Sequence, residues 1–243
     1  MDNIQKTIYE NKDFDDYTAK IAKGADTRIE LMRRYLAGTI KEKGTDLKVL
    51  DLGCADGEMF KDFAKKTQFY GVDISESFLK KAEKNGYKTY LMDAEKSALP
   101  FTDGFFDVAI TGETIEHVVD TDWFMCELNR VLKKDGNMII SIPNINQWIS
   151  VFMMLLADLP PRYSARFRAA HVRDFTFRTM KRCLKEFGFT INKRQGTGIF
   201  LPFISRNIFA GLTKLVPRIA TEVVFLCRKN SSILYDKKRI IEF

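Results

Sequence analysis

The 243-residue sequence predicts an α/β fold in which helices cover both faces of a mostly parallel sheet. Short apolar runs alternate with amphipathic stretches from about residue 47 to residue 143, and the connections between them are short. Each of the first three runs has an aspartate near its end, which suits strands whose carboxyl ends line a ligand site. With 45% hydrophobic residues, a chain of this length can bury a large core without disulfides.

Each element follows from its pattern. Strands are predicted where apolar residues are continuous or alternate, at 47–54, 68–75, 87–94, 105–112, 137–143 and 221–229. Helices are predicted where apolar residues recur at helical spacing, at 14–43, 56–66, 76–86, 123–136 and 175–189. Gly44, Gly86 and Gly136 predict three of the helix ends. Residues 147–175 and 196–218 interrupt the alternation and are expected to be insertions.

Composition limits the function classes. No apolar run approaches the roughly 18–20 residues of a membrane span, the first residues contain no signal-peptide pattern, and the four cysteines are scattered. A cytoplasmic protein is therefore expected. The net charge of +7 is uneven, because residues 1–142 carry 21 Lys and Arg against 26 Asp and Glu, whereas residues 143–243 carry 18 against 6. The basic half is either a solvated surface or a surface that meets lipid headgroups, a phosphorylated substrate or RNA.

A ligand site is predicted at the ends of the first three strands. The segment VLDLGCADG places Asp51, Gly53, Ala55 and Gly57 after the first strand, where small residues let backbone N–H groups approach a ligand. Asp73 ends the second strand about 20 residues later, where a carboxylate can accept both ribose hydroxyls. A dinucleotide enzyme would need GxGxxG, and a carboxylate at residue 51 would repel a pyrophosphate.

These motifs, together with GVDIS and MDAEKSALPFTDGFFDVAITGETIEH, resemble those of class I S-adenosylmethionine-dependent methyltransferases over about residues 45–230. The resemblance implies a Rossmann-like, seven-stranded sheet and S-adenosylmethionine as cofactor. It also implies a role for each residue of the site. Asp51, Gly53, Ala55 and Gly57 would hold the methionyl part, Asp73 the ribose, Ile74 the adenine face, and Asp93 and the Ala94 backbone the adenine edge, with Thr111 also lining the cofactor. Ala55 stands where the family often has glycine.

The resemblance also implies one domain over residues 1–243. Its parts would be an N-terminal helical cap at 1–44, a cofactor-binding half at 45–143, an acceptor-binding half at 144–230 that holds both insertions, and a tail at 231–243.

A second motif follows the fourth strand. Glu113, Glu116 and His117 form E-x-x-E-H, and the only other histidine is His171. Two carboxylates and two imidazoles can bind a divalent cation. The motif is similar to that of quinone-biosynthesis O-methyltransferases and small-RNA 2′-O-methyltransferases, which implies that these four residues bind Mg²⁺ or another divalent cation. Two alternatives stay open: His117 and Glu116 act in catalysis without metal, or the motif is structural.

The two insertions point to the acceptor. Residues 148–156 are apolar on nearly every face, which indicates either a buried contact or a lid, and Arg162, Arg166 and Arg168 follow. In the second insertion Ile204, Ile208, Leu212 and Val216 recur at four-residue spacing beside Lys214. This pattern is typical of a helix packed on a core or lying in a membrane interface.

The expected function is O-methylation of a hydrophobic small molecule, lipid or quinone-like acceptor, with metal assistance left open. The protein is also expected to contact the inner face of an anionic membrane. RNA 2′-O-methylation ranks below this reading, and a non-catalytic cofactor-binding protein is the alternative from another class. The oligomeric state is not predicted.

Overall fold

The structure, a computed structural model, describes residues 27–156, 171–199 and 210–236. Its strands are β1 (Lys48–Leu52), β2 (Gln68–Asp73), β3 (Lys88–Leu91), β4 (Phe106–Gly112), β5 (Leu132–Pro143), β6 (Phe189–Gly196) and β7 (Glu222–Lys229). They form one seven-stranded sheet in the order β3-β2-β1-β4-β5-β7-β6. Only β7 runs antiparallel to its neighbours, β5 and β6. The predicted mostly parallel, Rossmann-like sheet is confirmed.

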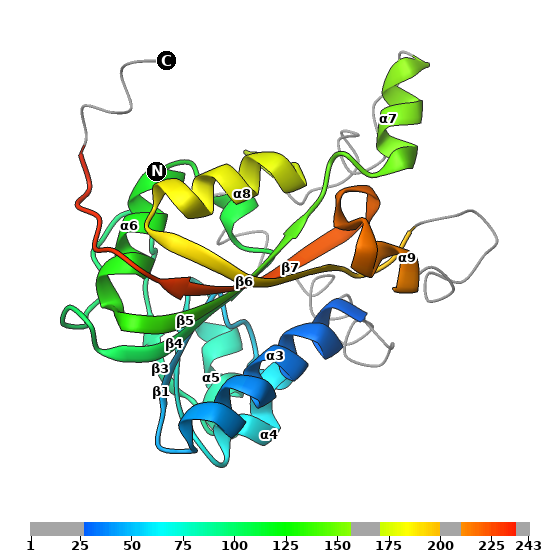
Figure 1. Cartoon of the computed structure of the whole chain (residues 1–243). Helices are drawn as coiled ribbons and strands as arrows, with labels where there is room; N and C mark the ends of the chain where they lie inside the picture. Colours follow the sequence, from blue (N-terminus) through cyan, green and yellow to red (C-terminus); the bar gives the residue numbers. More distant parts are fainter. Residues whose placement is uncertain (1–26, 157–170, 200–209, 237–243) are drawn as a thin grey trace.

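Helices cover both faces of this sheet (Figure 1). They are α3 (Thr27–Lys43), η1 (Glu58–Phe60), α4 (Lys61–Ala64), α5 (Glu76–Lys84), η2 (Ile115–His117), α6 (Thr121–Val131), α7 (Trp148–Leu155), α8 (Phe177–Glu186), α9 (Ala210–Leu215) and η5 (Pro217–Ile219). None of the helices within the described ranges is long and apolar enough to cross a bilayer.

The apolar core lies in two layers, because successive strand residues point to opposite faces. Val49 and Ile139 pack with α3 and α5 on one face, whereas Leu50 and Ile140 pack with α6 and α8 on the other. These central strands are buried on both faces, which explains why they are continuously apolar in the sequence.

The predicted helix 123–136 is wrong at its end. Helix α6 stops at Val131, and Leu132 begins β5 and pairs with Phe106 of β4. Asp135 has a φ of 62°, in the left-handed region, which is incompatible with a right-handed α-helix. The helical spacing of apolar residues continues past Val131, but the residues between Leu132 and Asn137 form a bulge in β5.

Two other elements of the structure differ from the prediction. The helix expected at 56–66 is short, with a 3₁₀ turn before α4. The seven-stranded sheet was predicted, but the position of strand β6 in the sequence was not. It is an edge strand in which Asn192, Lys193 and Arg194 are exposed, and its apolar alternation is weak. Residues 14–26 of the first predicted helix, the arginines of 160–168, and Ile204 and Ile208 lie outside the described residues.

The described part of the tail, residues 231–236, packs on α6. The Ile233 amide donates to Asn129 Oδ1 at 3.2 Å, and the Tyr235 hydroxyl donates to Asp120 Oδ2 at 2.6 Å. The ring of Tyr235 meets Trp123 edge-on with centroids 5.1 Å apart. The described part of the tail therefore belongs to the α6 layer.

Asn144 joins the elements around the site end of β5. Its side chain is buried, and Nδ2 donates to the carbonyls of Arg218 and Ala220 at 2.9 and 2.8 Å. Its Oδ1 accepts from the Phe177 amide at 3.3 Å, at the start of α8. One amide thus holds β5, α8 and the entry to β7 together.

Asn144→Ala should lower the free energy of unfolding by about 2–3 kcal/mol, because it leaves buried backbone groups without partners. Urea unfolding followed by circular dichroism measures this. Asn192→Ala, at an exposed position of β6, is the control and should change stability by less than about 0.5 kcal/mol. Equal stability of the two variants would contradict the assigned role of Asn144.

Candidate functional site

Parallel pairing aligns the carboxyl ends of the central strands. Asp51 of β1 lies opposite Gly71 of β2 and Ile110 of β4. The turns after these strands therefore lie at the same edge of the sheet, which we call the carboxyl edge. In this fold class ligands bind at that edge.

The turn after β1 needs small residues. Gly53, Ala55 and Gly57 have φ values of 78°, 45° and 69°. A Cβ on Gly53 would lie 2.5 Å from Thr114 Oγ1, and one on Gly57 would lie 2.8 Å from the Tyr87 ring. Ala55 is the one non-glycine residue of the three, and its amide is held by a carboxylate of the next strand. The turn thus forms a cradle of backbone close to the sheet edge.

That carboxylate is Asp73, at the end of β2. Its Oδ2 accepts from the Ala55 amide and its Oδ1 from the Ser75 amide, both at 2.9 Å. Burial raises the pKa of Asp73, and the amide donors oppose this effect. Both oxygens are fixed in direction, and the residue stays partly exposed at the edge beside Ile74.

Asp51 is buried below the cradle. The Tyr87 hydroxyl donates to its Oδ2 at 3.1 Å. Burial raises the pKa of Asp51 to about 7, the Tyr87 hydrogen bond opposes the rise, and the charge of Asp73 adds to it. Tyr87 was not predicted as a site residue, since nothing in the sequence marks it apart from its place after Gly86.

The turn after β3 is held by local contacts. Asp93 accepts from the Glu95 amide at 3.1 Å and pairs with Lys96 at 3.1 Å. The Ala94 carbonyl accepts from Trp123 Nε1 at 3.2 Å. Trp123 therefore supports the segment predicted to read adenine, and the sequence did not single it out.

Thr111 is a different case. It lies fully buried in β4, and its hydroxyl bonds to no side chain or backbone group of the described residues. Its predicted contact with the cofactor stays a prediction.

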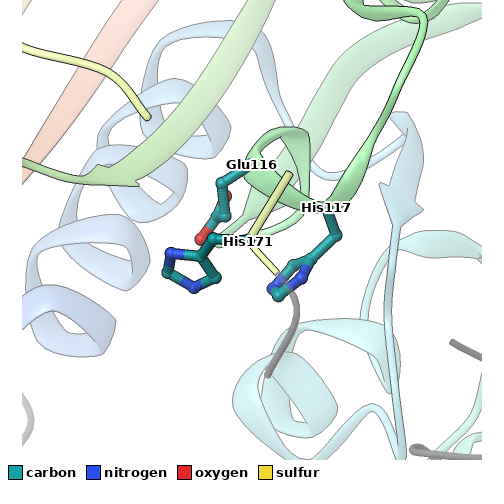
Figure 2. A group of neighbouring side chains, drawn as sticks. All are labelled: Glu116, His117 and His171. Carbon is teal, nitrogen blue, oxygen red and sulfur yellow. The ribbon is translucent and has the colours of Figure 1, made fainter. Parts of the chain in front are cut away.

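Three of the four predicted metal ligands come together. One ligand atom each of Glu116, His117 and His171 lies within 4.8 Å of the others (Figure 2). The two imidazole rings meet edge-on, with centroids 4.9 Å apart and an interplanar angle of 83°. Glu116 is buried, whereas both histidines are partly exposed. We call these three residues the Glu-His-His cluster.

Glu113 lies outside the Glu-His-His cluster. It has a left-handed φ of 54°, and its amide donates to the Ser141 carbonyl at 3.2 Å. This turn redirects the chain from β4 into η2, so that the residues three and four positions later form the cluster instead.

Backbone hydrogen bonds bring His171 to the cluster. The amides of Val172 and Arg173 donate to the Glu116 carbonyl at 2.9 and 3.1 Å. The Arg173 guanidinium donates twice to the Val119 carbonyl, at 3.0 and 2.8 Å. The segment that begins with His171 is thus tied to the turn after β4, which no local sequence pattern reveals.

A buried cation also lies at this edge. Arg28 of α3 is 6% exposed, and its Nη1 donates to Ser141 Oγ at 3.4 Å. A Cβ on Gly112 would lie 3.3 Å from the same nitrogen, so the guanidinium packs against the end of β4. Sequence reasoning missed Arg28, because it reads as one more charge in an amphipathic helix.

The arrangement suits two kinds of chemistry. The cradle and Asp73 can bind a molecule with a ribose and a cationic or polar chain. Two imidazoles and one carboxylate can hold a divalent cation with open positions, or move a proton from a hydroxyl.

Comparisons with known proteins find methyltransferases. Residues 50–140 match the family model described as a methyltransferase domain. The malonyl-[acyl-carrier protein] O-methyltransferase of Legionella pneumophila is 29% identical over 68% of this chain and 56% of its own. The ubiquinone biosynthesis O-methyltransferase of Pelagibacter ubique is 29% identical over 54% of this chain and 58% of its own. The chain thus matches less than two thirds of the length of these curated relatives.

The fold has solved counterparts. Magnesium protoporphyrin IX methyltransferase of Synechocystis, solved with bound S-adenosylhomocysteine, superposes with a TM-score of 0.65 at 14% identity, over 93% of this chain and 98% of its own. Residues 50–140 thus form a methyltransferase domain, and the described residues have the Rossmann-like fold of class I S-adenosylmethionine-dependent methyltransferases.

Proposed function

We propose that the protein is an S-adenosylmethionine-dependent O-methyltransferase for an apolar acceptor. The observation that carries the proposal is the position of the Glu-His-His cluster. It follows β4 at the same carboxyl edge where Asp73 and the turn after β1 form the cradle. Two relatives named as O-methyltransferases support the methylated atom.

The cradle fits the cofactor. S-adenosylmethionine, when bound, would supply an activated methyl group. Asp73 presents two fixed oxygens for a ribose diol, and Ile74 follows for the adenine face. The left-handed backbone of Gly53 and Gly57 lets the turn pack closely against Thr114 and Tyr87, where a Cβ would clash. The ionised form of Asp51 attracts the cationic amino group of a methionyl chain.

The Glu-His-His cluster fits a divalent cation. Two of its three donors are imidazole nitrogens, which suit Fe²⁺, Ni²⁺ or Zn²⁺ better than Mg²⁺. A cation held there would lower the pKa of an acceptor hydroxyl. In the alternative without a cation, His117 is partly exposed at the edge and can itself accept the hydroxyl proton, while buried Glu116 orients the imidazoles.

A second candidate function uses the same cluster. The 18 Lys and Arg against 6 Asp and Glu in residues 143–243 favour an anionic acceptor such as RNA. RNA 2′-O-methylation would require binding that falls steeply with salt. A cofactor-binding protein without turnover is the remaining alternative, and it would bind S-adenosylmethionine tightly without transfer.

Asp73→Ala should weaken S-adenosylhomocysteine binding about a hundredfold, since two hydrogen bonds to a charged group are lost. Isothermal titration calorimetry measures the affinity. Asp46→Ala, at an exposed aspartate before β1, is the matched control and should bind as the wild type does. Unchanged affinity in Asp73→Ala would refute the ribose assignment.

Cofactor binding should depend on the protonation of Asp51, whose pKa burial raises to about 7. Affinity should fall about tenfold between about pH 8 and about pH 6, because only the ionised form attracts the amino group. Asp51→Asn should lose most of this dependence.

The same raised pKa acts on stability with the opposite sign. The folded state binds this proton more tightly than the unfolded state, whose aspartates titrate near about 3.9. The contribution is therefore present at low pH and is lost as the pH rises from about 4 to about 7. Without cofactor, Asp51→Asn should melt above the wild type at about pH 8. An affinity independent of pH in the wild type would contradict this role.

Glu116→Gln, His117→Ala and His171→Ala should each cut methyl transfer at least about a hundredfold while cofactor affinity stays within about twofold. Transfer of labelled methyl into a cell extract measures the rate, and calorimetry measures the affinity. Glu113→Gln is the matched control outside the cluster and should keep most of the activity. Full activity in all three cluster variants would place the chemistry elsewhere.

A further inference from the structure

Helix α7 presents apolar side chains to solvent. It contains no charged residue, and four large side chains in its last turns and at its end are exposed: Phe152 (52%), Met154 (43%), Leu155 (78%) and Leu156 (65%). In Figure 1 the helix stands away from the sheet. Single exposed leucines are ordinary, but a group of this kind on one helix marks an interaction site.

Helix α9 also exposes apolar side chains, and it buries a polar one. Among residues 212–215, whose burial is described, Thr213 is the buried one, and its hydroxyl donates to the Gly196 carbonyl at 3.1 Å. Leu212 and Leu215 are 45% and 81% exposed, with Lys214 exposed between them. A helix that packs on a core buries its apolar side chains and exposes its polar ones. Of the two alternatives expected for this apolar stripe, core packing does not hold for Leu212, whose side chain is exposed.

Both helices lie at the carboxyl edge. β6 is antiparallel to β7, and β7 is antiparallel to β5, so β5 and β6 end at the same edge as β4. Helix α7 follows the end of β5, and α9 contacts the last residue of β6. The exposed apolar residues thus share this edge with the Glu-His-His cluster.

Charge distinguishes the candidate occupants. Neither helix contains an acidic residue, and Lys214 and the nearby Arg218 are both exposed. Residues 143–243 as a whole carry three times as many basic as acidic residues. A second copy of the chain would bring these like charges together, whereas an anionic lipid surface attracts them.

We propose that α7 and α9 dock the protein on an anionic phospholipid bilayer. Phe152, Leu155 and Leu215 enter the boundary between headgroups and acyl chains, and the carboxyl edge then faces the lipid. An eight-residue helix is about 12 Å long, which suits an interfacial anchor. That the bilayer also delivers the acceptor rests on the proposed function; the docking itself does not.

The test is co-sedimentation with vesicles of phosphatidylcholine that contain about 30% phosphatidylglycerol, compared with pure phosphatidylcholine. The wild type should bind the anionic vesicles, and added salt should reduce binding. The double variant Leu155→Glu/Leu215→Glu should lower the bound fraction at least about fivefold, since both side chains are exposed and the change places charge in the interface. Melting temperatures of the variants verify that they are folded.

Leu234→Glu is the matched control, because Leu234 is 90% exposed on the tail rather than on either helix. It should bind vesicles as the wild type does. Wild-type protein that ignores anionic vesicles, or a double variant that binds them fully, would overturn the proposal. So would a wild-type dimer in light scattering that the double variant turns into a monomer, since a second copy would then cover the surface.

S-adenosylhomocysteine titration of the same samples separates the two proposals. Cofactor binding without vesicle binding would refute docking and leave the proposed function standing. Vesicle binding without cofactor binding would do the reverse.

Discussion

The parallel pairing of β1 with β2 and β4 is the constraint on which the site depends. It places Asp51 level with Gly71 and Ile110, so that three turns lie at one edge. Those turns then support one another. Asp73 holds the Ala55 amide in the neighbouring turn, and Thr114 fills the space that a side chain on Gly53 would need. The cradle is therefore held by contacts within the protein, and its small residues are required by their neighbours.

The second constraint joins distant parts of the chain. The Glu116 carbonyl accepts hydrogen bonds from the amides of Val172 and Arg173, and the Arg173 guanidinium donates to the Val119 carbonyl. Because these bonds involve backbone groups, they do not depend on a recognisable pattern of side chains. They place His171 beside His117. The segment that supplies His171 lies within the basic half of the chain and follows the apolar helix α7 in sequence. Chemistry, charge and exposed apolar surface thus meet at one edge.

Most of the sheet could be predicted, because buried parallel strands are continuous apolar runs and the turns after them are marked by Gly53, Gly57 and Asp73. Strand β6 could not, since an edge strand is stabilised by backbone pairing and carries exposed Lys193 and Arg194. The end of α6 was misplaced because apolar spacing does not show a bulge at Asp135. In the site, the motif residues were visible, but Tyr87, Trp123 and Arg28 act through contacts that only the fold creates.

The outward-facing leucines of α9 illustrate the same limit, since periodicity shows that a stripe exists but not which way it faces. The direction of these side chains bears on the identity of the methyl acceptor. The direct measurement is transfer of labelled methyl from S-adenosylmethionine into a whole-cell extract, with and without chelator, followed by partition between organic and RNA fractions. Metal-assisted O-methylation of an apolar acceptor predicts chelator-sensitive label in the organic phase. Label in RNA, or no transfer by protein that binds the cofactor, would contradict it.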